Sequence, residues 1–522
     1  MESTTCKKPY SVLSIVFFFS GVTLTFLWSI SPMPVIYYLA AMVISGIIWG
    51  YVAFKYHIVD KALKNRCKCD VVLAIIVSVV FILANDHHIN ELSLPVITFS
   101  AFSLCLVFIY VLGRIRNSVI DFFRGLEKHE RIFLAVGSTV FAVIIIILFN
   151  QTNVFYLPFR NGTYRYYDVI YSTDTGAIVD SNCYLYPGAP ENDFRQPLFG
   201  IFAMPFALLA TFVSYMIPLA YSYPLCLNIT QNILLFITLL LLSRMLEVSK
   251  TTQIYFLLLS TVTFPFMLFA LNMEQYIFAV FWTILLIYNN YTTRKTNLTL
   301  SVAATGSLLT SAILIPPLLI LNKEFRGIVK KGLKMLLMFF AVFICGGMTY
   351  LIYDFNSFIM LKRFAAIHGF IEKFIQFTHF TGSCLIAPCS RIISDGDHIL
   401  YRLCAMQTVN MAGIIVLGLS VLSGYLFRRK YIAQISIYWI AFAFVLICLF
   451  GWGTAENGVV LYSLYFFWAF IILFILLIDK LMCNTKYSRH IVFCVLFLAL
   501  MVYNMIKMLD MINFGIAFYP VV

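Results

Sequence analysis

The chain has 522 residues, of which 62% are hydrophobic and 11% are charged, and its mean hydropathy is +0.92. A soluble domain carries about 25% charged residues, so the composition excludes an ordinary soluble protein and predicts a chain embedded in a lipid bilayer. The formal net charge of +13 would suggest a nucleic-acid partner in a soluble protein. Here the basic residues lie mostly in short loops beside apolar segments, which indicates membrane topology instead. We therefore expect a bilayer as partner and no nucleic acid.

The first third of the chain contains five apolar segments with the length or near-length of a membrane span. Lys and Arg are concentrated in the loops after the second and fourth segments, and the other two connections contain neither. The positive-inside rule then places the N-terminus in the cytosol and the residues after Phe149 outside. The first segment follows Lys7 and Lys8 as in a signal peptide, but no small-residue cleavage site follows, which favours a retained helix. The five segments are residues 10–29, 34–54, 71–84, 95–113 and 132–149.

A polar outer segment, residues 150–196, leads into a further apolar stretch, residues 197–217. If that stretch crossed the membrane, Arg244 and Lys250 after the next span would fall outside, against the charge rule. Pro197 and Pro205 within it, and Pro218 directly after it, also suit a broken or interfacial helix better than a regular span. The sequence therefore predicts a juxtamembrane helix and a first outer loop that covers residues 150–217.

The same argument covers the remaining spans. Residues 298–321 have basic residues at both ends and are predicted to form a hairpin of two short helices that turns near Thr310. A second long outer loop is predicted at residues 354–408. The fold class is all-α: a polytopic transmembrane bundle of about fifteen spans, with the C-terminus outside. Residues 1–130 would be an N-terminal four-helix extension, and residues 131–522 the main membrane domain. The other spans are residues 223–243, 254–271, 276–291, 334–353, 410–427, 432–450, 459–478 and 491–508.

Polar residues that could support chemistry gather in the first outer loop. The sequence Asp174-Thr175-Gly176 predicts a tight turn that exposes a carboxylate, although such turns are commonly only turns. A carboxylate at a membrane surface can accept a proton from an attacking hydroxyl. Arg165 and Arg195 could each bind a phosphate leaving group through two hydrogen bonds, or could simply place their charged ends in interfacial water.

This layout resembles the GT-C glycosyltransferases, which include protein mannosyltransferases and their bacterial relatives. Asp174-Thr175-Gly176 and Gln196-Pro197-Leu198 are similar to the Asp-Ser-Gly and His-Pro-Pro motifs of that family. The hairpin at residues 298–321, an acidic residue in the next short outer loop (Met273-Glu274-Gln275) and the late sequence Gly451-Trp-Gly-Thr-Ala-Glu456-Asn457 also resemble its layout. The resemblance covers about residues 131–522. It departs at Gln196, where the family has histidine, and in the four preceding helices, which have no counterpart.

The resemblance implies a polyprenyl-phosphate-linked sugar as donor and a glycan, lipid or protein as acceptor, with transfer on the outer face of the plasma (inner) membrane. Asp174 would be the general base, which gives inversion by direct displacement. No metal site is predicted, and a need for a divalent metal stays open. Glu274 could also be a satisfied loop acid, and Asn457 a helix cap. The substrate-binding candidates are Arg165, Asp193, Arg195, Gln196, Glu274, Glu456 and Asn457.

Three other functions compete with this interpretation. A transporter or flippase of lipid-linked saccharides is usually built from repeats with a site at the membrane midplane, whereas this sequence places its acids in predicted outer loops. A surface-polysaccharide ligase or polymerase also uses outer loops, but would be expected to rely on Arg and His. A non-catalytic scaffold is the third. Separately, Cys384 and Cys389 of the second outer loop could form a disulfide in an oxidising compartment.

Overall fold

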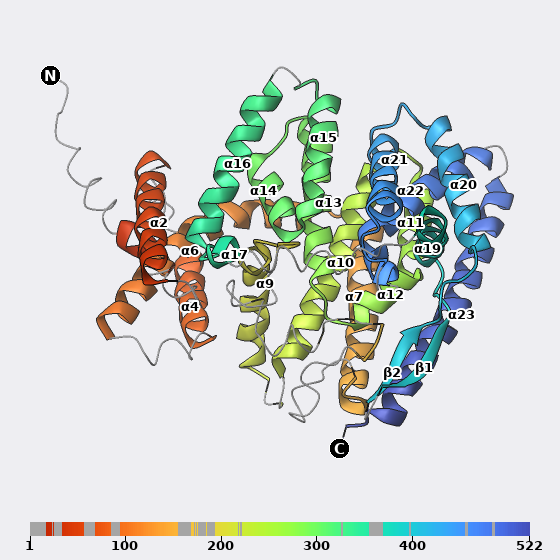
Figure 1. Cartoon of the computed structure of the whole chain (residues 1–522), viewed down its shortest axis with the longest axis horizontal. Coiled ribbons are helices and arrows are strands. Elements are labelled where there is room, and N and C mark those ends of the chain that lie inside the picture. The colour runs from red at the N-terminus through yellow and green to blue at the C-terminus, as the bar shows by residue number, and fades with distance from the viewer. Residues whose placement is uncertain are drawn as a thin grey trace.

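The computed structural model is a bundle of helices with one two-stranded sheet (Figure 1). It describes residues 17–22, 25, 34–56, 68–84, 94–154, 169–171, 173, 175, 184, 194–217, 219, 222–324, 327–353, 369–395, 398–454, 458–482 and 486–521. In its first half the helices are α2 (Val35–Tyr56), α4 (Lys68–Ala84), α6 (Leu94–Arg124), α7 (Lys128–Gln151), α9 (Phe199–Ser214), α10 (Ser222–Met245), α11 (Lys250–Thr261) and α12 (Phe264–Leu271).

The second half continues with helices and the sheet. Its elements are α13 (Tyr276–Thr293), α14 (Leu298–Ser307), η1 (Leu309–Leu314), α15 (Ile315–Leu321), α16 (Ile328–Cys345), α17 (Tyr350–Tyr353), α19 (Phe370–Ser383), β1 (Ser390–Asp395), β2 (His398–Leu403), α20 (Met411–Leu426), α21 (Tyr431–Phe444), η4 (Val445–Leu449), η5 (Gly458–Tyr462), α22 (Ser463–Leu481) and α23 (Lys486–Phe518).

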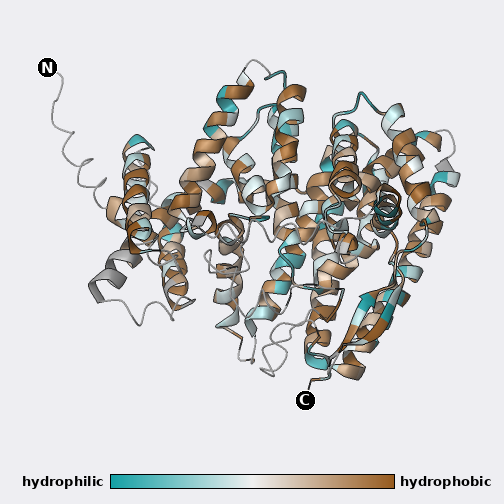
Figure 2. Cartoon of the chain, in the orientation of Figure 1, coloured by the Kyte–Doolittle hydropathy of each residue, from teal (hydrophilic) through white to brown (hydrophobic). Residues whose placement is uncertain are grey.

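Six helices in the described part of the chain are long and apolar enough to cross a membrane, or seven if the bent pair α11–α12 counts as one span. They indicate a multi-pass membrane protein, as the composition predicts. The count is lower than the about fifteen spans predicted, in part because several of the predicted spans form short helices in the described part of the chain, namely α14, the stretch from η1 to α15, and α20. Figure 2 shows hydrophobic residues along the helices and hydrophilic ones on the connections at the top of the view and on the two strands.

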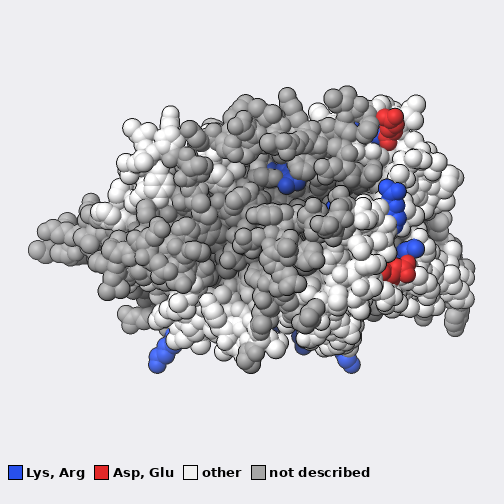
Figure 3. Space-filling view, turned by 60° about the horizontal axis from the view of Figure 1, so that its bottom comes forward, with Lys and Arg blue, Asp and Glu red and all other residues white. Residues whose placement is uncertain are grey.

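The connections rich in Lys and Arg gather at one end of the bundle. Lys430 Nζ donates to the carbonyl of Glu247 at 3.0 Å, and the Arg294 guanidinium lies 4.9 Å from the Tyr431 ring centre. The connections α15–α16 and α20–α21 both lie at the top of Figure 1. The C-terminus and the two strands lie at the bottom, and Figure 3, turned towards that end, shows a few charged side chains on the described part of that face, much of which is drawn as not described. Basic connections gathered at one end of a bundle are what the positive-inside rule expects of one side of a membrane.

Helices α7 and α10 form an antiparallel pair at the centre of the apolar core. The start of α7 meets the end of α10 through Glu130 and Arg244, and farther along α7 the ring of Phe236 packs against Gly137 and, at 5.8 Å between ring centres, against Phe141. Gly137 gives the ring its space, because a Cβ at that position would collide with it. The chain between the end of α7 and the start of α10 therefore leaves from, and returns to, the same lower end (Figure 1).

The prediction that residues 197–217 lie flat at the surface is wrong in orientation. Ser222 donates to the carbonyl of Ser214 at 3.1 Å, so the end of α9 meets the start of α10. At the other end of α9, Tyr184 contacts Phe199 at 5.1 Å between ring centres and accepts from Gln231 Nε2 at 2.9 Å. Helix α9 therefore runs antiparallel beside the first part of α10 (Figure 1). The charge rule indicates on which side the ends of a segment lie, not how deeply the segment enters.

The predicted hairpin at residues 298–321 is confirmed. Asn297 caps α14 by accepting from two backbone N–H groups, and the chain turns at Leu308 into η1 and α15. The two open ends are joined because the backbone N–H of Thr296 donates to Glu324 Oε2 at 3.2 Å. Glu324 also forms an ion pair with Lys331. Both ends of the hairpin thus lie at the basic end of the bundle and its tip lies inside.

The first described helices and the strands complete the bundle. Helices α2, α4 and α6 lie on the left of Figure 1, where Arg116 of α6 pairs with Asp70 of α4 at 2.6 Å. The division of the chain at residue 130 stays a prediction. Strands β1 and β2 are antiparallel and were not predicted; they occupy part of the second outer loop, residues 354–408, of which residues 354–368 lie outside the described residues.

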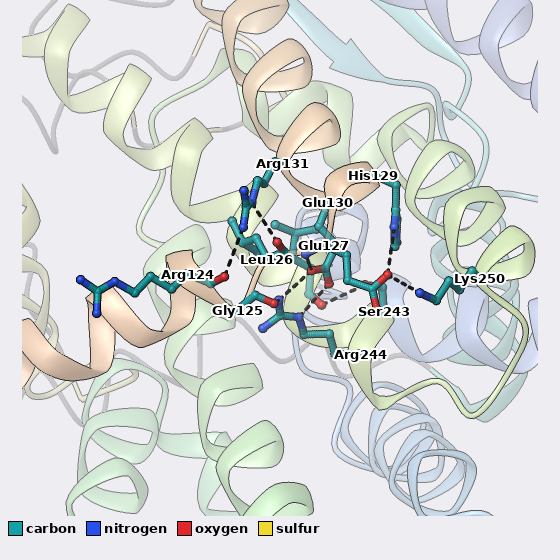
Figure 4. A network of polar contacts seen from close by, with 11 residues as sticks. Arg124, Gly125, Leu126, Glu127, His129, Glu130, Arg131, Ser243, Arg244 and Lys250 are labelled. Carbon is teal, nitrogen blue, oxygen red and sulfur yellow. Dashed lines mark hydrogen bonds and ion pairs between the residues drawn. The ribbon is translucent and has the colours of Figure 1, made fainter.

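A network of charged residues joins α6, α7, α10 and α11 at the basic end (Figure 4). Arg244 donates to both carboxylate oxygens of Glu130 at 2.7 Å, and to the carbonyl of Gly125 at 2.9 Å. Glu130 also accepts from the backbone N–H of Glu127 at 2.8 Å. The acids lie in the first turn of α7 and Arg244 in the last turn of α10, so each charge opposes the partial charge of its helix end. Lys250 of α11 pairs with Glu127 at 2.6 Å.

Two substitutions separate the buried pair of this network from the exposed one. Arg244→Ala leaves the Glu130 carboxylate, which is 5% exposed, without its cation; we expect a loss of about 3 kcal/mol in unfolding free energy. Lys250→Ala removes a partner that is 72% exposed and should cost less than about 1 kcal/mol. Denaturant titration in detergent micelles measures both losses. Equal losses in the two variants would contradict this account of the junction.

The Glu324 carboxyl predicts a pH dependence. Its burial alone would raise its pKa, but hydrogen bonds from Lys331 and Thr296 outweigh burial and hold the pKa below its ordinary value. A carboxyl whose pKa is lower in the folded state stabilises the fold above its unfolded pKa, about 4.3, and loses this contribution as the pH falls through the folded value. Glu324→Gln should therefore lower the melting temperature at pH 7, and the difference from wild type should shrink below about pH 4. A pH-independent difference would refute the electrostatic origin.

Candidate functional site

The span formed by α11 and α12 is broken inside the bundle, with a bend of 59°. Pro265, in the first turn of α12, lacks a backbone N–H and so suits a helix start. At the break, the buried amide of Asn504 on α23 donates to the carbonyl of Val262 at 2.7 Å, and the N–H of Phe264 donates to the carbonyl of Leu385 at 3.2 Å. Asn504 also donates to the carbonyl of Leu385 at 2.8 Å and accepts from the N–H of Ala387 at 2.8 Å, which ties the segment after α19 to the break. In an apolar surrounding such partners are required, because an unsatisfied backbone group is costly.

Helix α12 ends within the bundle, and residues 272–275 turn the chain into α13. Two side chains of α10 satisfy carbonyls of this turn: Asn228 Nδ2 donates to Leu271 at 2.7 Å, and Gln231 Nε2 donates to Glu274 at 3.0 Å. Glu274 is 1% exposed. The prediction of a short outer loop is therefore wrong here: the turn is buried, because polar side chains of a neighbouring helix replace water as partners of its backbone.

A residue of the first outer loop reaches the same turn. The Thr175 hydroxyl donates to the carbonyl of Met273 at 2.9 Å, and Thr173 bonds back to the carbonyl of Ile170 at 2.8 Å. Both threonines are buried. Asp174, which stands between them in the chain, lies outside the described residues. Part of the predicted outer loop thus lies beside the Glu274 turn rather than in bulk solvent.

The start of α9 is held by the tip of the hairpin. The N–H of Leu198 donates to the carbonyl of Gly306, and the N–H of Leu309 donates to the carbonyl of Arg195, both at 2.8 Å. Gln196, which lies between these contacts, is buried and its Nε2 donates to the Tyr465 hydroxyl at 3.1 Å. The backbone pairing therefore fixes where the Gln196 side chain enters the bundle.

Tyrosine rings border this position. The ring centre of Tyr465 is 5.0 Å from that of Tyr276 and 6.4 Å from that of Tyr462, to which it is stacked. The Tyr462 ring lies against Gly453, whose φ of +74° and lack of a side chain both require glycine. Gly453 of the late glycine-rich sequence therefore lies against one of these tyrosines.

These contacts define a polar layer within the apolar bundle, which consists of Thr175, Tyr184, Gln196, Gln231, Glu274 and Tyr465. The Tyr465 hydroxyl is within electrostatic range of both Glu274 and Arg195. Gln231 lies nine residues after the first residue of α10, which corresponds to about 14 Å along a helix. Three segments that do not cross the bundle, namely the start of α9, the α12–α13 turn and the hairpin tip, thus meet at one depth.

Several buried polar atoms at this depth have no hydrogen-bond partner among the described residues. They include the side-chain oxygens of Gln196 and Gln231, the Nδ2 of Asn272 and the hydroxyl of Ser307. Unpaired buried polar atoms are uncommon in folded proteins and need an explanation. A bound polar ligand that forms hydrogen bonds with these atoms would explain them.

The predicted site residues divide into two groups. Arg195, Gln196 and Glu274 are described; all three lie at the polar layer or in contact with it. Sequence reasoning missed Asn228 and Gln231, which lie three residues apart on one face of a largely apolar span, where polar residues point to function or to packing of interrupted backbone. The predicted residues that lie outside the described part are Arg165, Asp174, Asp193, Glu456 and Asn457.

The layer offers hydrogen-bond donors and acceptors, one carboxylate and tyrosine rings in a water-poor surrounding. Such a set can hold hydroxyl groups of a polar molecule, and the low dielectric strengthens each contact. Within the described ranges, no cluster of three or more His, Cys, Asp or Glu side chains could hold a metal ion. Comparisons of the chain with family models, curated proteins and solved structures found no match.

Packing at the hairpin tip can be tested with two glycines. An added Cβ at Gly306 would lie 2.6 Å from Leu198 Cβ, whereas one at Gly332 on α16 meets nothing within 4 Å. Gly306→Ala should destabilise the protein by about 1–3 kcal/mol through overpacking, and Gly332→Ala should be neutral or slightly stabilising. Thermal unfolding in detergent compares the two variants. A neutral Gly306→Ala would mean that the tip does not dock on the start of α9.

Proposed function

We propose that this chain is a membrane-embedded inverting glycosyltransferase, which moves a sugar from a polyprenyl-phosphate donor to an acceptor hydroxyl on the non-cytosolic face. One observation carries the proposal: the bond from Thr175 to the carbonyl of Met273 places a direct neighbour of Asp174 beside the buried Glu274. The segment that resembles the acidic motif of the GT-C enzymes therefore contacts the bundle at the polar layer through Thr175.

The proposed reaction is a single displacement. Asp174 takes the proton of the acceptor hydroxyl as its oxygen attacks the anomeric carbon, and the bond from that carbon to the phosphate oxygen breaks. The polyprenyl phosphate leaves with the electron pair, and Arg165 and Arg195 bind its negative charge. Glu274 and Gln196 hold sugar hydroxyls, and Asp193, Glu456 and Asn457 contact the donor or acceptor.

The unpartnered polar atoms at the layer support a ligand rich in hydroxyl groups. The side-chain oxygens of Gln196 and Gln231 can accept hydrogen bonds, and Asn272 Nδ2 can donate one. A sugar supplies both kinds of partner, and the nearby tyrosine rings suit its apolar faces. A donor with an isoprenoid tail would reach this depth from the surrounding lipid.

The proposed orientation follows from the basic connections at one end of the bundle. The basic end would face the cytosol, and the end with the C-terminus and the strands would face outwards. The first outer loop would then begin and end on the outer side of a plasma (inner) membrane. The acceptor, whether glycan, lipid or protein, would approach from there.

A transporter of lipid-linked saccharides is the second candidate, and the broken span α11–α12 favours it. Discontinuous helices whose ends meet inside the membrane commonly form transporter sites. The two candidates differ in chemistry, because only a transferase makes a new glycosidic bond. The purified protein should therefore form a glycosylated product in detergent, where no compartments exist, from a polyprenyl-phosphate sugar and an acceptor. Translocation in liposomes without any product would favour the transporter.

Matched acidic substitutions test the proposed roles. Asp174→Asn should lower product formation by about 10²–10⁴-fold, the usual contribution of a general base. Glu274→Gln should raise the Michaelis constant for the donor, since its role is binding. Asp510→Asn changes an exposed acid of α23 that pairs with Lys507 at 3.5 Å and should leave product formation unchanged. Wild-type turnover by Asp174→Asn, with unchanged folding, would refute the assignment of the base.

A further inference from the structure

Two cysteines close the open end of the β1–β2 hairpin. Ser390 and Leu403 are the last paired residues of the strands, so Cys389 and Cys404 stand directly opposite each other one position beyond. The N–H of Cys404 donates to the carbonyl of Cys389 at 2.9 Å, and their sulfur atoms are 2.7 Å apart. Cys389 is exposed and Cys404 is partly exposed, so an external oxidant can reach them.

Cys384 has a different environment from that expected for a partner of Cys389. Its side chain is buried, and its sulfur lies 3.9 Å from the carbonyl oxygen of Ser463. The suggested pairing of Cys384 with Cys389 is therefore replaced by the pairing of Cys389 with Cys404.

The β1–β2 hairpin supports the segment of chain that leads to Asp174, the proposed base. Strand β2 pairs with residues 169–171: Tyr401 donates its N–H to the carbonyl of Val169, and Tyr171 donates to the carbonyl of Tyr401, both at 2.9 Å. The Tyr171 hydroxyl also lies 2.8 Å from Ser390 Oγ. The pKa of Tyr171 is held well above its ordinary value by burial and by the nearby Tyr401.

Tyr171 itself has an unusual backbone. Its φ of +50° lies in the left-handed region, which a bulky residue adopts only when its surroundings impose it. The hairpin supplies that restraint through the two backbone bonds and the Ser390 contact, and Phe264 of α12 adds an edge-to-face contact at 5.9 Å. A hairpin that opened at its base would release this conformation three residues before Asp174.

We propose that Cys389 and Cys404 form a disulfide in the mature protein and that this bond fixes the hairpin against residues 169–171. Each thiol loses a proton and an electron as the sulfur–sulfur bond forms, and the disulfide of an oxidised thiol–disulfide oxidoreductase accepts both electrons and becomes a dithiol. The inference rests on the proposed outward orientation of this end, where such oxidants operate. It does not depend on glycosyl transfer.

Peptide mapping tests the bond directly. Membranes are treated with N-ethylmaleimide without a reductant, and the full-length protein is digested and analysed by mass spectrometry. We expect Cys389 and Cys404 in one cross-linked species, which a reductant resolves, and the exposed Cys69 at the start of α4 in alkylated form. Alkylation of both hairpin cysteines before reduction, or linkage of Cys389 to Cys384, would overturn the proposal.

A second measurement tests what the bond does. The melting temperature of wild type in detergent should fall when a reductant is added, and Cys389→Ser and Cys404→Ser should show the lowered value with or without reductant. The matched control Cys494→Ser should retain the wild-type value and its response to reductant. An unchanged melting temperature on reduction of a confirmed bond would overturn the role in fixing the hairpin. Neither measurement uses transferase activity, so a failure here is distinct from a failure of the proposed function.

Discussion

The backbone groups of interrupted helices must find partners inside an apolar bundle, and this requirement determines how the centre of the protein is built. Where α12 ends, the carbonyls of Leu271, Met273 and Glu274 accept from side chains of Asn228, Thr175 and Gln231. Where α11 breaks, Asn504 does the same for Val262. An unsatisfied carbonyl in such a place costs free energy on the order of several kcal/mol. The first role of each of these side chains is therefore to satisfy a backbone carbonyl.

The same requirement explains why a polar layer exists at all. The segments that do not cross the whole bundle end inside it. The backbone groups at their ends need polar neighbours, and those neighbours lie at one depth. Gln196 reaches the layer because Arg195 and Leu198 pair with the hairpin tip. A site of this kind combines a rigid apolar frame with few polar groups, which is the usual composition of a site for a small polar ligand. A transferase and a transporter would both need it, and only the chemistry of the loop distinguishes them.

Sequence reasoning identified the features that depend on local charge and hydropathy. The hairpin at residues 298–321 was predicted because basic residues flank it on both sides. The depth of Glu274 and the steep orientation of α9 were not, since both depend on contacts with α10 that no charge rule encodes. The strands were not predicted, although β1 and β2 pair with each other within the second outer loop; the further pairing of β2 with Ile170, more than two hundred positions away, could not be expected from local sequence. The register of the β1–β2 hairpin, which was not predicted, places Cys404 rather than Cys384 opposite Cys389.

The central claim is that a lipid-linked sugar binds where the start of α9, the α12–α13 turn and the hairpin tip meet. A short-chain polyprenyl-phosphate sugar with a photoreactive group on the sugar ring tests this claim most directly. After irradiation of membranes, we predict that the label maps to residues 194–198 and 272–275 and that unlabelled donor competes for it. Competed labelling confined to peptides outside these two segments and the hairpin tip would contradict the account.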